Sequence, residues 1–494
     1  MLWAAAGDVE AAMRQVVVYV AVVVLLPATA LAQDAKAVVA DALKAMGAAD
    51  LTSITYSGAA GQGNFGQSRT ISFGLATTTI GNYTRTIDFT QPAARTTGIT
   101  QPPTPRGGPP PMPGTLDQRI TPANLAWPQH YQIWVTPWGF LRGAATNPAT
   151  VRSRKIDDVV YKVVTWSPPQ KAPSGIAYKV VGYINAENLV ERVETWVDHP
   201  IVGDMHVELA FNNYRDINGL KVPTQVRQRQ VGMEMQVVAI KDARANPPNV
   251  QELLTAPAAG GAAPAPNAGG PPAAAPVVAS EKLADGVYRI TGGYVALAVE
   301  FKDHVVVLEG GQNEARGLAI IAETRRLFPA KRIKYVVNSH PHFDHAGGLA
   351  PFVAEGITLL VDDNSKFFVE AALGSPRTLV GDALGKSKKK PKVEGVVEKM
   401  VLQDETRTLE LHHVKDLEHS DAMLIAYLPK ERILFTADFN LPAPGQPVSP
   451  SIATLIANIE RLKLDFDRHV TVHAPNPDRV LTKADLLALT KGAN

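Results

Sequence analysis

The chain has 494 residues, no cysteine, and 49 lysine and arginine side chains against 47 aspartate and glutamate side chains. This even charge balance provides no global field that would recruit nucleic acid or an anionic membrane. The lack of cysteine excludes disulfides, thiolate nucleophiles and thiolate metal ligands. At about 100–200 residues per domain, the length predicts two or three domains.

Residues 1–32 show the pattern of a secretory signal peptide. A positive charge at Arg14 is followed by the apolar run VVVYVAVVVLL, and small residues end the segment at Ala32. A helix needs about 20 apolar residues to span a bilayer, and this run is shorter. We therefore expect no stable transmembrane span after the signal peptide is cleaved. The mature protein is therefore expected to be periplasmic or secreted. Met13 is an alternative start of translation.

Residues 33–255 are predicted to form a mostly antiparallel β domain that follows one helix at 34–47. Its strand-like segments are rich in β-branched and aromatic residues with partial period-two alternation, which is typical of a sheet covered on one face. At the level of fold alone, one helix followed by many strands resembles the half-barrel of periplasmic lipoprotein carriers. The segments that carry this prediction are 159–166, 177–184, 189–198 and 205–214.

Two segments rich in proline and glycine divide the chain. The first, at 100–114, is predicted to be an exposed loop within the N-terminal half. The second, at 256–278, is long, uncharged and low in complexity, as flexible linkers between domains are. A domain boundary is expected there, and a fragment that starts near Val277 is expected to fold alone.

Residues 279–494 are predicted to form a layered α/β domain, because strand-like and helix-like segments alternate along them. Helices are expected where apolar residues recur with helical spacing, and strands where short β-branched runs occur. Helices are predicted at 314–328 and 451–464, and strands at 304–311, 332–339, 357–363, 422–429, 432–439 and 469–475.

The stretch VVNSHPHFDHAGGL (336–349) concentrates candidate metal ligands directly after a predicted strand. A neutral imidazole binds zinc at roughly 2.0–2.1 Å, and a carboxylate oxygen binds at a similar distance. His340 and His342 are two residues apart and can point the same way, while Asp344 and His345 follow on the turn. This spacing suits two adjacent metal ions.

One segment cannot complete two metal sites, so further ligands are expected where later strands begin or end. His419 precedes a predicted strand, Asp438 ends the next one, and His473 ends the last one. Loops at such positions can carry a side chain into a cleft.

On the basis of these residues, the chain from about 280 to 494 resembles the metallo-β-lactamase-fold hydrolases. Their H-x-H-x-D-H motif is found here at residues 340–345. The resemblance implies an αββα sandwich with the site at one edge between two sheets. It implies that His340, His342 and His419 hold one metal ion and that Asp438 bridges to the second. The second ion would be held by Asp344, His345 and His473.

The resemblance further implies two Zn²⁺ ions, with iron and manganese as compatible alternatives, and a metal-bound hydroxide that attacks the substrate. Asp344 would orient that nucleophile. Asp438, which bridges the two ions, is the second predicted catalytic residue. The retained His342 disfavours the diiron oxygen-reducing relatives, which usually have glutamate there. We therefore expect an exported hydrolase of a small molecule with an ester, thioester, lactone or amide bond, and no nucleic-acid partner.

Two alternatives stay open. One is a periplasmic β-lactamase of the cysteine-free type. The other is an envelope protein that binds a lipid or other ligand through its N-terminal domain and carries a degenerate hydrolase domain. Departures from the family pattern at Glu309, Ala422 and Ala474 affect the loops, so the substrate class is left open, and the sequence predicts no oligomeric state. The remaining histidines are assigned structural or surface roles, including His412 and His413.

Overall fold

The computed structural model describes residues 34–71, 77–104, 111–123, 126–255, 278–439 and 448–489. The expected signal peptide, and the expected linker except for its last residue, lie outside the described residues. In the ranges given, no helix has the length and apolar character needed to cross a membrane.

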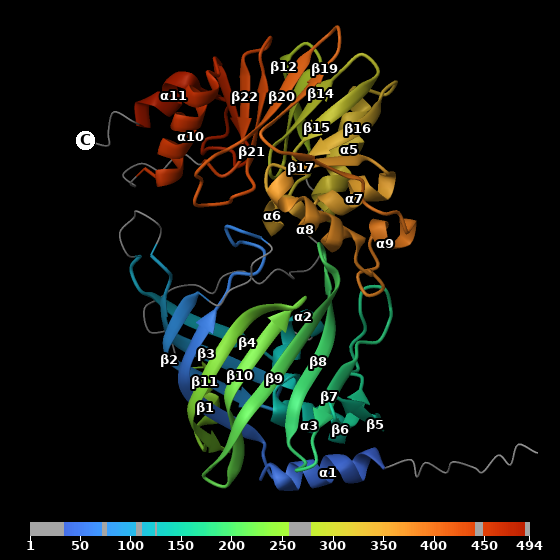
Figure 1. Ribbon diagram of the computed structural model, residues 1–494, viewed down its shortest axis with the longest axis vertical. Coiled ribbons are helices and arrows are strands. Elements are labelled where there is room, and N and C mark those ends of the chain that lie inside the picture. The colour runs from blue at the N-terminus through green and yellow to red at the C-terminus, as the bar shows by residue number, and fades with distance from the viewer. Residues whose placement is uncertain are drawn as a thin grey trace, which may run out of the picture.

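The N-terminal part is one antiparallel sheet of eleven strands in the order β4-β3-β2-β1-β11-β10-β9-β8-β7-β6-β5 (Figure 1). The sheet curves around helices α2 (Trp127–Trp134) and α3 (Pro137–Thr146), while α1 (Ala35–Ala45) lies at its lower end. The antiparallel β-rich fold expected for this region is confirmed. The strands are β1 (Ser53–Gln62), β2 (Thr78–Asp88), β3 (Ala93–Gln101), β4 (Gly114–Ile120), β5 (Ala149–Ile156), β6 (Val159–Trp166), β7 (Val180–Ile184), β8 (Val190–His199), β9 (Gly203–Ile217), β10 (Leu220–Gln230) and β11 (Met233–Ala245).

The alternation of side chains explains why this sheet has one covered face. Along β9, Val207, Leu209 and Phe211 are buried, and the residues between them are partly exposed. Trp138 and Phe140 of α3 are completely buried in the same core. Period-two alternation therefore directs one face of the strand to the helices.

The C-terminal part has two sheets, with strand orders β12-β13-β14-β15-β16-β17-β18 and β19-β20-β21-β22-β23-β24. The first sheet is antiparallel up to β15 and parallel from β15 to β18. Its strands are β12 (Ala279–Ala284), β13 (Val287–Thr291), β14 (Ala296–Glu300), β15 (His304–Leu308), β16 (Arg332–Val337), β17 (Thr358–Asp362) and β18 (Val393–Val396). The second sheet has β19 (Lys399–Gln403), β20 (Thr408–His413), β21 (Leu424–Leu428), β22 (Ile433–Thr436), β23 (Arg468–Thr471) and β24 (Leu481–Thr482).

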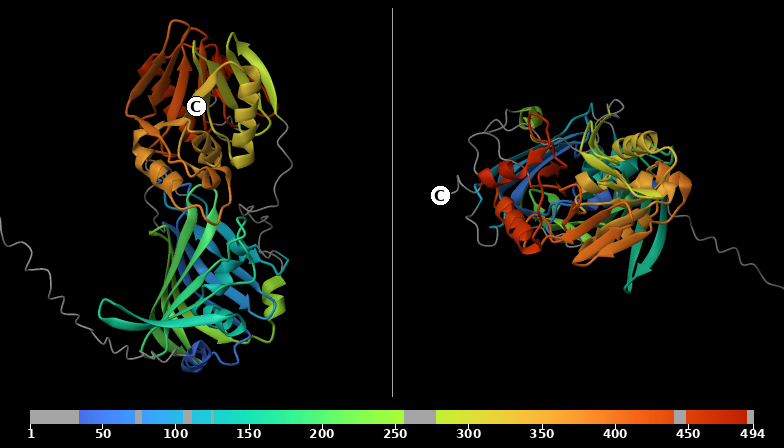
Figure 2. Two further views of the ribbon diagram at one scale, coloured as in Figure 1. Left: turned by 90° about the vertical axis from the view of Figure 1, so that its right-hand side faces the viewer. Right: turned by 90° about the horizontal axis from the view of Figure 1, so that it is seen from above.

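Helices cover the outer faces of the two sheets, so the predicted αββα sandwich is confirmed (Figures 1 and 2). The inner faces pack together through one core, in which Val306 and Leu308 of β15 meet residues such as Ile425 and Phe435. The helices after the N-terminal sheet are α4 (Val250–Thr255), α5 (Glu314–Leu327), α6 (Phe343–Ala346), α7 (Leu349–Glu355), α8 (Asp363–Gly374), α9 (Ala383–Ser387), α10 (Pro450–Leu462) and α11 (Lys483–Ala488).

The sandwich meets the N-terminal sheet along one edge, which carries α6 and α8 (Figure 1). Strand β16, in the first sheet, and strands β22 and β23, in the second, all end shortly before predicted ligands. The fold therefore brings residues that are far apart in the sequence to the edge that the N-terminal part covers.

Candidate metal centre

The H-x-H-x-D-H motif forms the turn between β16 and α7. His340 and His342 follow the strand, and Asp344 and His345 lie on the single turn of α6. His340, His342 and His345 are buried, while the Asp344 side chain is about a third exposed.

The glycine pair after the motif lets this turn pack against another one. An added Cβ at Gly348 would lie 2.0 Å from the carbonyl oxygen of Gly310, and one at Gly347 would lie 2.2 Å from that of Gln312. The Gly348 amide also donates to the Gly311 carbonyl at 2.8 Å. This close approach, which only glycine allows, holds the motif against the turn that carries Glu309.

The structure places all seven predicted ligands together, in two groups. Within each group, the candidate ligand atoms lie within 4.8 Å of one another. His419 comes from the loop between β20 and β21, Asp438 follows β22 with φ 57, and His473 follows β23. The groups are His340, His342, His419 and Asp438, and Asp344, His345 and His473.

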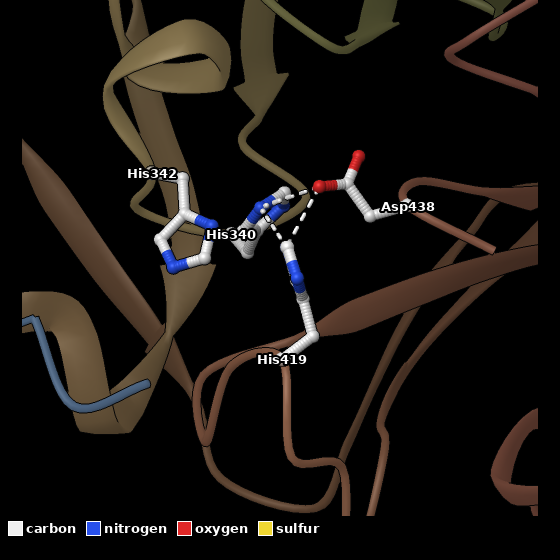
Figure 3. A group of neighbouring side chains, drawn as sticks. All are labelled: His340, His342, His419 and Asp438. Atoms are coloured by element: carbon white, nitrogen blue, oxygen red, sulfur yellow. Dashed lines mark hydrogen bonds and ion pairs between the residues drawn. The ribbon is translucent and has the colours of Figure 1, made fainter. Parts of the chain in front are cut away.

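Asp438 lies between the two groups with one oxygen toward each. Its Oδ2 is 2.7 Å from His419 Nε2 and 3.4 Å from His340 Nε2. Dashed lines in Figure 3 mark these two ion pairs. Its Oδ1 is 2.9 Å from His345 Nε2 and 2.7 Å from His473 Nε2. This is the placement required of a carboxylate that bridges two ions.

The donor atoms fit metal ions in spacing and chemistry. His419 Nε2 lies 3.3 Å from His340 Nε2, and His473 Nε2 lies 3.3 Å from His345 Nε2. Two nitrogens at 2.0–2.1 Å from a tetrahedral zinc are separated by about 3.3–3.4 Å. His342 Nδ1 is buried and has no hydrogen-bond partner. Its lone pair is therefore free to bind a metal ion.

Burial and neighbouring charges prepare these side chains differently. Burial lowers the pKa of His342 to about 4 and that of His340 well below its usual value, so both imidazoles are neutral at pH 7. Burial also opposes a charge on His345, but Glu309 and Asp438 outweigh it and raise the pKa of His345 to about 10. Burial disfavours a charge on Asp438 as well, yet the surrounding imidazoles hold the pKa of this carboxyl far below its usual value.

Comparison with known families agrees with this geometry. Residues 291–472 match the family described as the metallo-beta-lactamase superfamily. This part of the chain is a metallo-β-lactamase-superfamily domain. The match leaves the N-terminal sheet outside it.

Relatives of the superfamily domain share little sequence with this chain. The 2,4-dinitroanisole O-demethylase subunit alpha of Nocardioides sp. (strain JS1661) is 23% identical over 207 residues, which are 40% of this chain and 58% of that protein. The chain thus spans less than two thirds of that relative's length. Solved structures include a metallo-β-lactamase from Pontibacter korlensis (17% identity, 43% of this chain, 98% of that one, TM-score 0.33) and FIM-1 from Pseudomonas aeruginosa in the mono-zinc form (16%, 44%, 98%, TM-score 0.33).

Glu309, one of the three departures from the family pattern, lies beneath the second group of candidate ligands. It is completely buried with φ 74, and its Oε2 accepts a hydrogen bond from Ser339 Oγ at 2.6 Å. The same oxygen lies 3.4 Å from His345 Nδ1. The carboxylate therefore orients the His345 ring so that Nε2 faces Asp438.

Three residues at the site were missed by sequence reasoning. Tyr294 donates its hydroxyl to Asp344 Oδ2 at 2.8 Å, and its ring centroid lies 4.4 Å from that of His473. Gln67 Nε2 donates to Asp344 Oδ1 at 2.6 Å, and the Ser68 carbonyl accepts from His342 Nε2 at 3.1 Å. Gly292 and Gly293 signal a turn before Tyr294, but no pattern indicates which surface that turn meets.

The neighbouring histidines and acids occupy supporting positions. His412 Nε2 lies 2.9 Å from Glu410, and His413 Nδ1 lies 2.6 Å from Asp362. These pairs agree with the structural role assigned to His412 and His413. Asp421, in the same loop as His419, accepts a hydrogen bond from the Thr70 hydroxyl.

Proposed function

We propose that the C-terminal domain is a zinc-dependent hydrolase that holds two metal ions and cleaves an ester, thioester, lactone or amide bond. The observation that carries this proposal is the placement of Asp438, whose two oxygens face two separate sets of histidine nitrogens. Membership of residues 291–472 in the metallo-β-lactamase superfamily supports metal-dependent chemistry, although the superfamily also includes other activities.

Each group of side chains has a role in this proposal. His340, His342 and His419 would hold one ion, and His345, His473 and Asp344 the other. Bound metals would supply a Lewis acid for the scissile carbonyl and lower the pKa of a water molecule. Asp438 would keep the two ions at a fixed spacing. Asp344 has one oxygen held by Tyr294 and the other by Gln67, so it can orient a nucleophile from a fixed position.

The candidate ligands around Asp438 are five imidazoles and one carboxylate. This donor set favours zinc, because borderline metals prefer imidazole. His342 stands where oxygen-reducing diiron relatives usually have glutamate, which supports hydrolysis over redox chemistry. The full set of ligands also speaks against a degenerate domain that serves only a lipid-binding N-terminal part. Export to the periplasm or beyond is part of the proposal and depends on the signal-like pattern of residues 1–32.

A substrate panel tests the proposed function. The zinc-loaded protein is assayed with a chromogenic cephalosporin, a thioester, a lactone, a phosphodiester and 2,4-dinitroanisole, each with and without a chelator. Chelator-sensitive turnover of a thioester or lactone is the expected result, and turnover of the cephalosporin would favour the β-lactamase alternative. Protein that retains no stoichiometric metal after zinc supplementation would refute the proposal.

A further inference from the structure

A short segment of the N-terminal part reaches the metal centre and contacts the ligand motif. We call residues 65–70, which follow β1, the docking segment. Its Gly66 carbonyl accepts from the Phe343 amide at 2.9 Å. Beside this contact, the Ser68 carbonyl accepts from His342 Nε2 at 3.1 Å, and Gln67 Nε2 donates to Asp344 at 2.6 Å. Three consecutive residues of the docking segment thus contact three consecutive residues of the motif.

The other end of the docking segment holds the loop that carries His419. Arg69 Nε donates to the Leu417 carbonyl at 3.2 Å, and the Arg69 carbonyl accepts from the Asp421 amide at 3.1 Å. The Thr70 hydroxyl donates to the Asp421 carboxylate. These contacts lie on both sides of His419, so the docking segment restrains this loop at two points.

Aromatic packing fixes the docking segment against the motif. The Phe65 ring meets the Phe343 ring edge to face at a centroid distance of 4.9 Å, and His199 lies 4.9 Å from the same ring. Gly66 has φ +82, and an added Cβ there would lie 2.0 Å from Phe343 Cδ2. Only glycine fits at this position without displacing the docking segment or the Phe343 ring.

The contact at Ser68 decides which nitrogen of His342 can bind a metal. A carbonyl oxygen can only accept, so His342 Nε2 must carry the proton that it donates. In a neutral imidazole the other nitrogen then holds the lone pair, and Nδ1 is the buried atom without a hydrogen-bond partner. Such a partner behind a ligand fixes its tautomer and ring orientation.

We propose that the docking segment is a positioning part of the metal centre: it selects Nδ1 of His342 as the ligand atom and holds His419 and Asp344 in place. The N-terminal domain then strengthens metal binding at a site whose candidate ligands all belong to the other domain. This inference depends on the metal binding in the proposed function.

The test compares two glycine variants of the full-length protein. Gly66→Ala introduces both a strained backbone and the clash with Phe343. Gly232→Ala, at φ +85 in the turn between β10 and β11, introduces the strain with nothing within 4 Å. Zinc affinity is measured by competition with a chromophoric chelator, and the visible spectrum of the Co²⁺-loaded protein reports ligand geometry. We expect Gly66→Ala to bind zinc at least about 10-fold more weakly and to change the Co²⁺ spectrum. Gly232→Ala should match the wild type in both.

The outcomes separate this inference from the proposed function. Wild-type protein that binds no zinc would refute the proposed function. Wild-type protein that binds two ions, with Gly66→Ala equal to Gly232→Ala, would overturn this inference alone. If Gly66→Ala does not fold, the double variant Gln67→Ala/Thr70→Val decides, because it removes two side-chain contacts without altering the glycine. Unchanged zinc affinity and an unchanged Co²⁺ spectrum in that variant would also overturn the inference.

Discussion

Among the side chains of the metal centre, Asp438 is the one that contacts both groups of candidate ligands. It follows β22 in the left-handed region, which an aspartate tolerates better than a branched residue does. That backbone conformation accompanies the placement of one carboxylate oxygen toward His419 and the other toward His473. Loss of this side chain should therefore affect both groups, whereas loss of one histidine should affect its own.

Replacing Asp438 by alanine should abolish hydrolysis and lower zinc affinity by more than about 100-fold, since even a residue that only supports a ligand costs about 10–100-fold. His340→Ala should abolish activity as well. Metal content measured by mass spectrometry, together with turnover, checks both variants. Asp158→Ala, at a side chain that is 93% exposed, is the control. Activity within a few-fold of the wild type in either site variant would contradict the two-metal assignment.

Tyr294→Phe tests whether the phenol supports Asp344. Burial and the hydrogen bond to Asp344 raise the pKa of Tyr294 above its usual value, so the phenol keeps its proton and donates it. Removing the hydroxyl leaves one Asp344 oxygen without this donor. We expect the second zinc equivalent to bind about 10-fold more weakly while the first is unchanged, as measured by stepwise titration. Equal loss of both equivalents would contradict the assignment of Asp344 to the second group.

Zinc binding should release protons and weaken as the pH falls. With a pKa of about 10, His345 is protonated at pH 7 in the metal-free protein, and a metal can bind only its deprotonated form. His340 and His342 are already neutral at this pH and release none. The apparent zinc affinity should therefore increase from pH 6 to pH 8. Calorimetry in buffers of different ionisation enthalpy measures the released protons, and no release at pH 7 would contradict the pairing of His345 with Glu309 and Asp438.

At the scale of elements, the site depends on how closely two turns approach. The turn after the motif and the turn after β15 touch at Gly348 and Gly310, and this contact positions Glu309 beneath His345. Sequence patterns located elements well in both parts of the chain. The predicted strand at 159–166 coincides with β6, and the predicted helix at 314–328 differs from α5 only at its last residue.

Gly348→Ala should destabilise the protein by about 1–3 kcal/mol, the usual cost of an overpacked interior. The added Cβ would lie 2.0 Å from the Gly310 carbonyl oxygen, and a backbone atom cannot move away as a flexible side chain can. Gly81→Ala, whose nearest atom would be 4.0 Å away, is the matched control for adding a methyl group. Denaturant unfolding of both variants measures the difference, and equal stability would show that the turns can separate freely.

At the scale of the whole molecule, the two parts of the chain are joined by more than the docking segment. Arg377, between α8 and α9, donates to the Ile201 carbonyl at 2.9 Å and to the Pro200 carbonyl at 2.6 Å. Asp204 accepts from the Leu379 amide at 2.8 Å. The segment between α8 and α9 therefore contacts the hairpin between β8 and β9.

A fragment that starts at residue 278 should fold but bind zinc more weakly than the full-length protein. The core between its two sheets consists only of residues from the C-terminal part, which supports independent folding. The docking segment would be missing, so His342 and His419 would lose their restraints. Circular dichroism and chelator competition measure the two properties. An insoluble or molten fragment would show that the parts depend on each other for folding.

The sequence by itself determined the ligand types, their order and the elements that carry them, because these depend on local spacing and on the side-chain periodicity of strands and helices. The motif at 340–345 indicated the metal chemistry, and the strand ends indicated His419, Asp438 and His473. Only the tertiary structure decided that Tyr294 and the docking segment contact the same site. These contacts join residues up to several hundred positions apart through backbone carbonyls and ordinary polar side chains, which no local pattern distinguishes from those on any other loop.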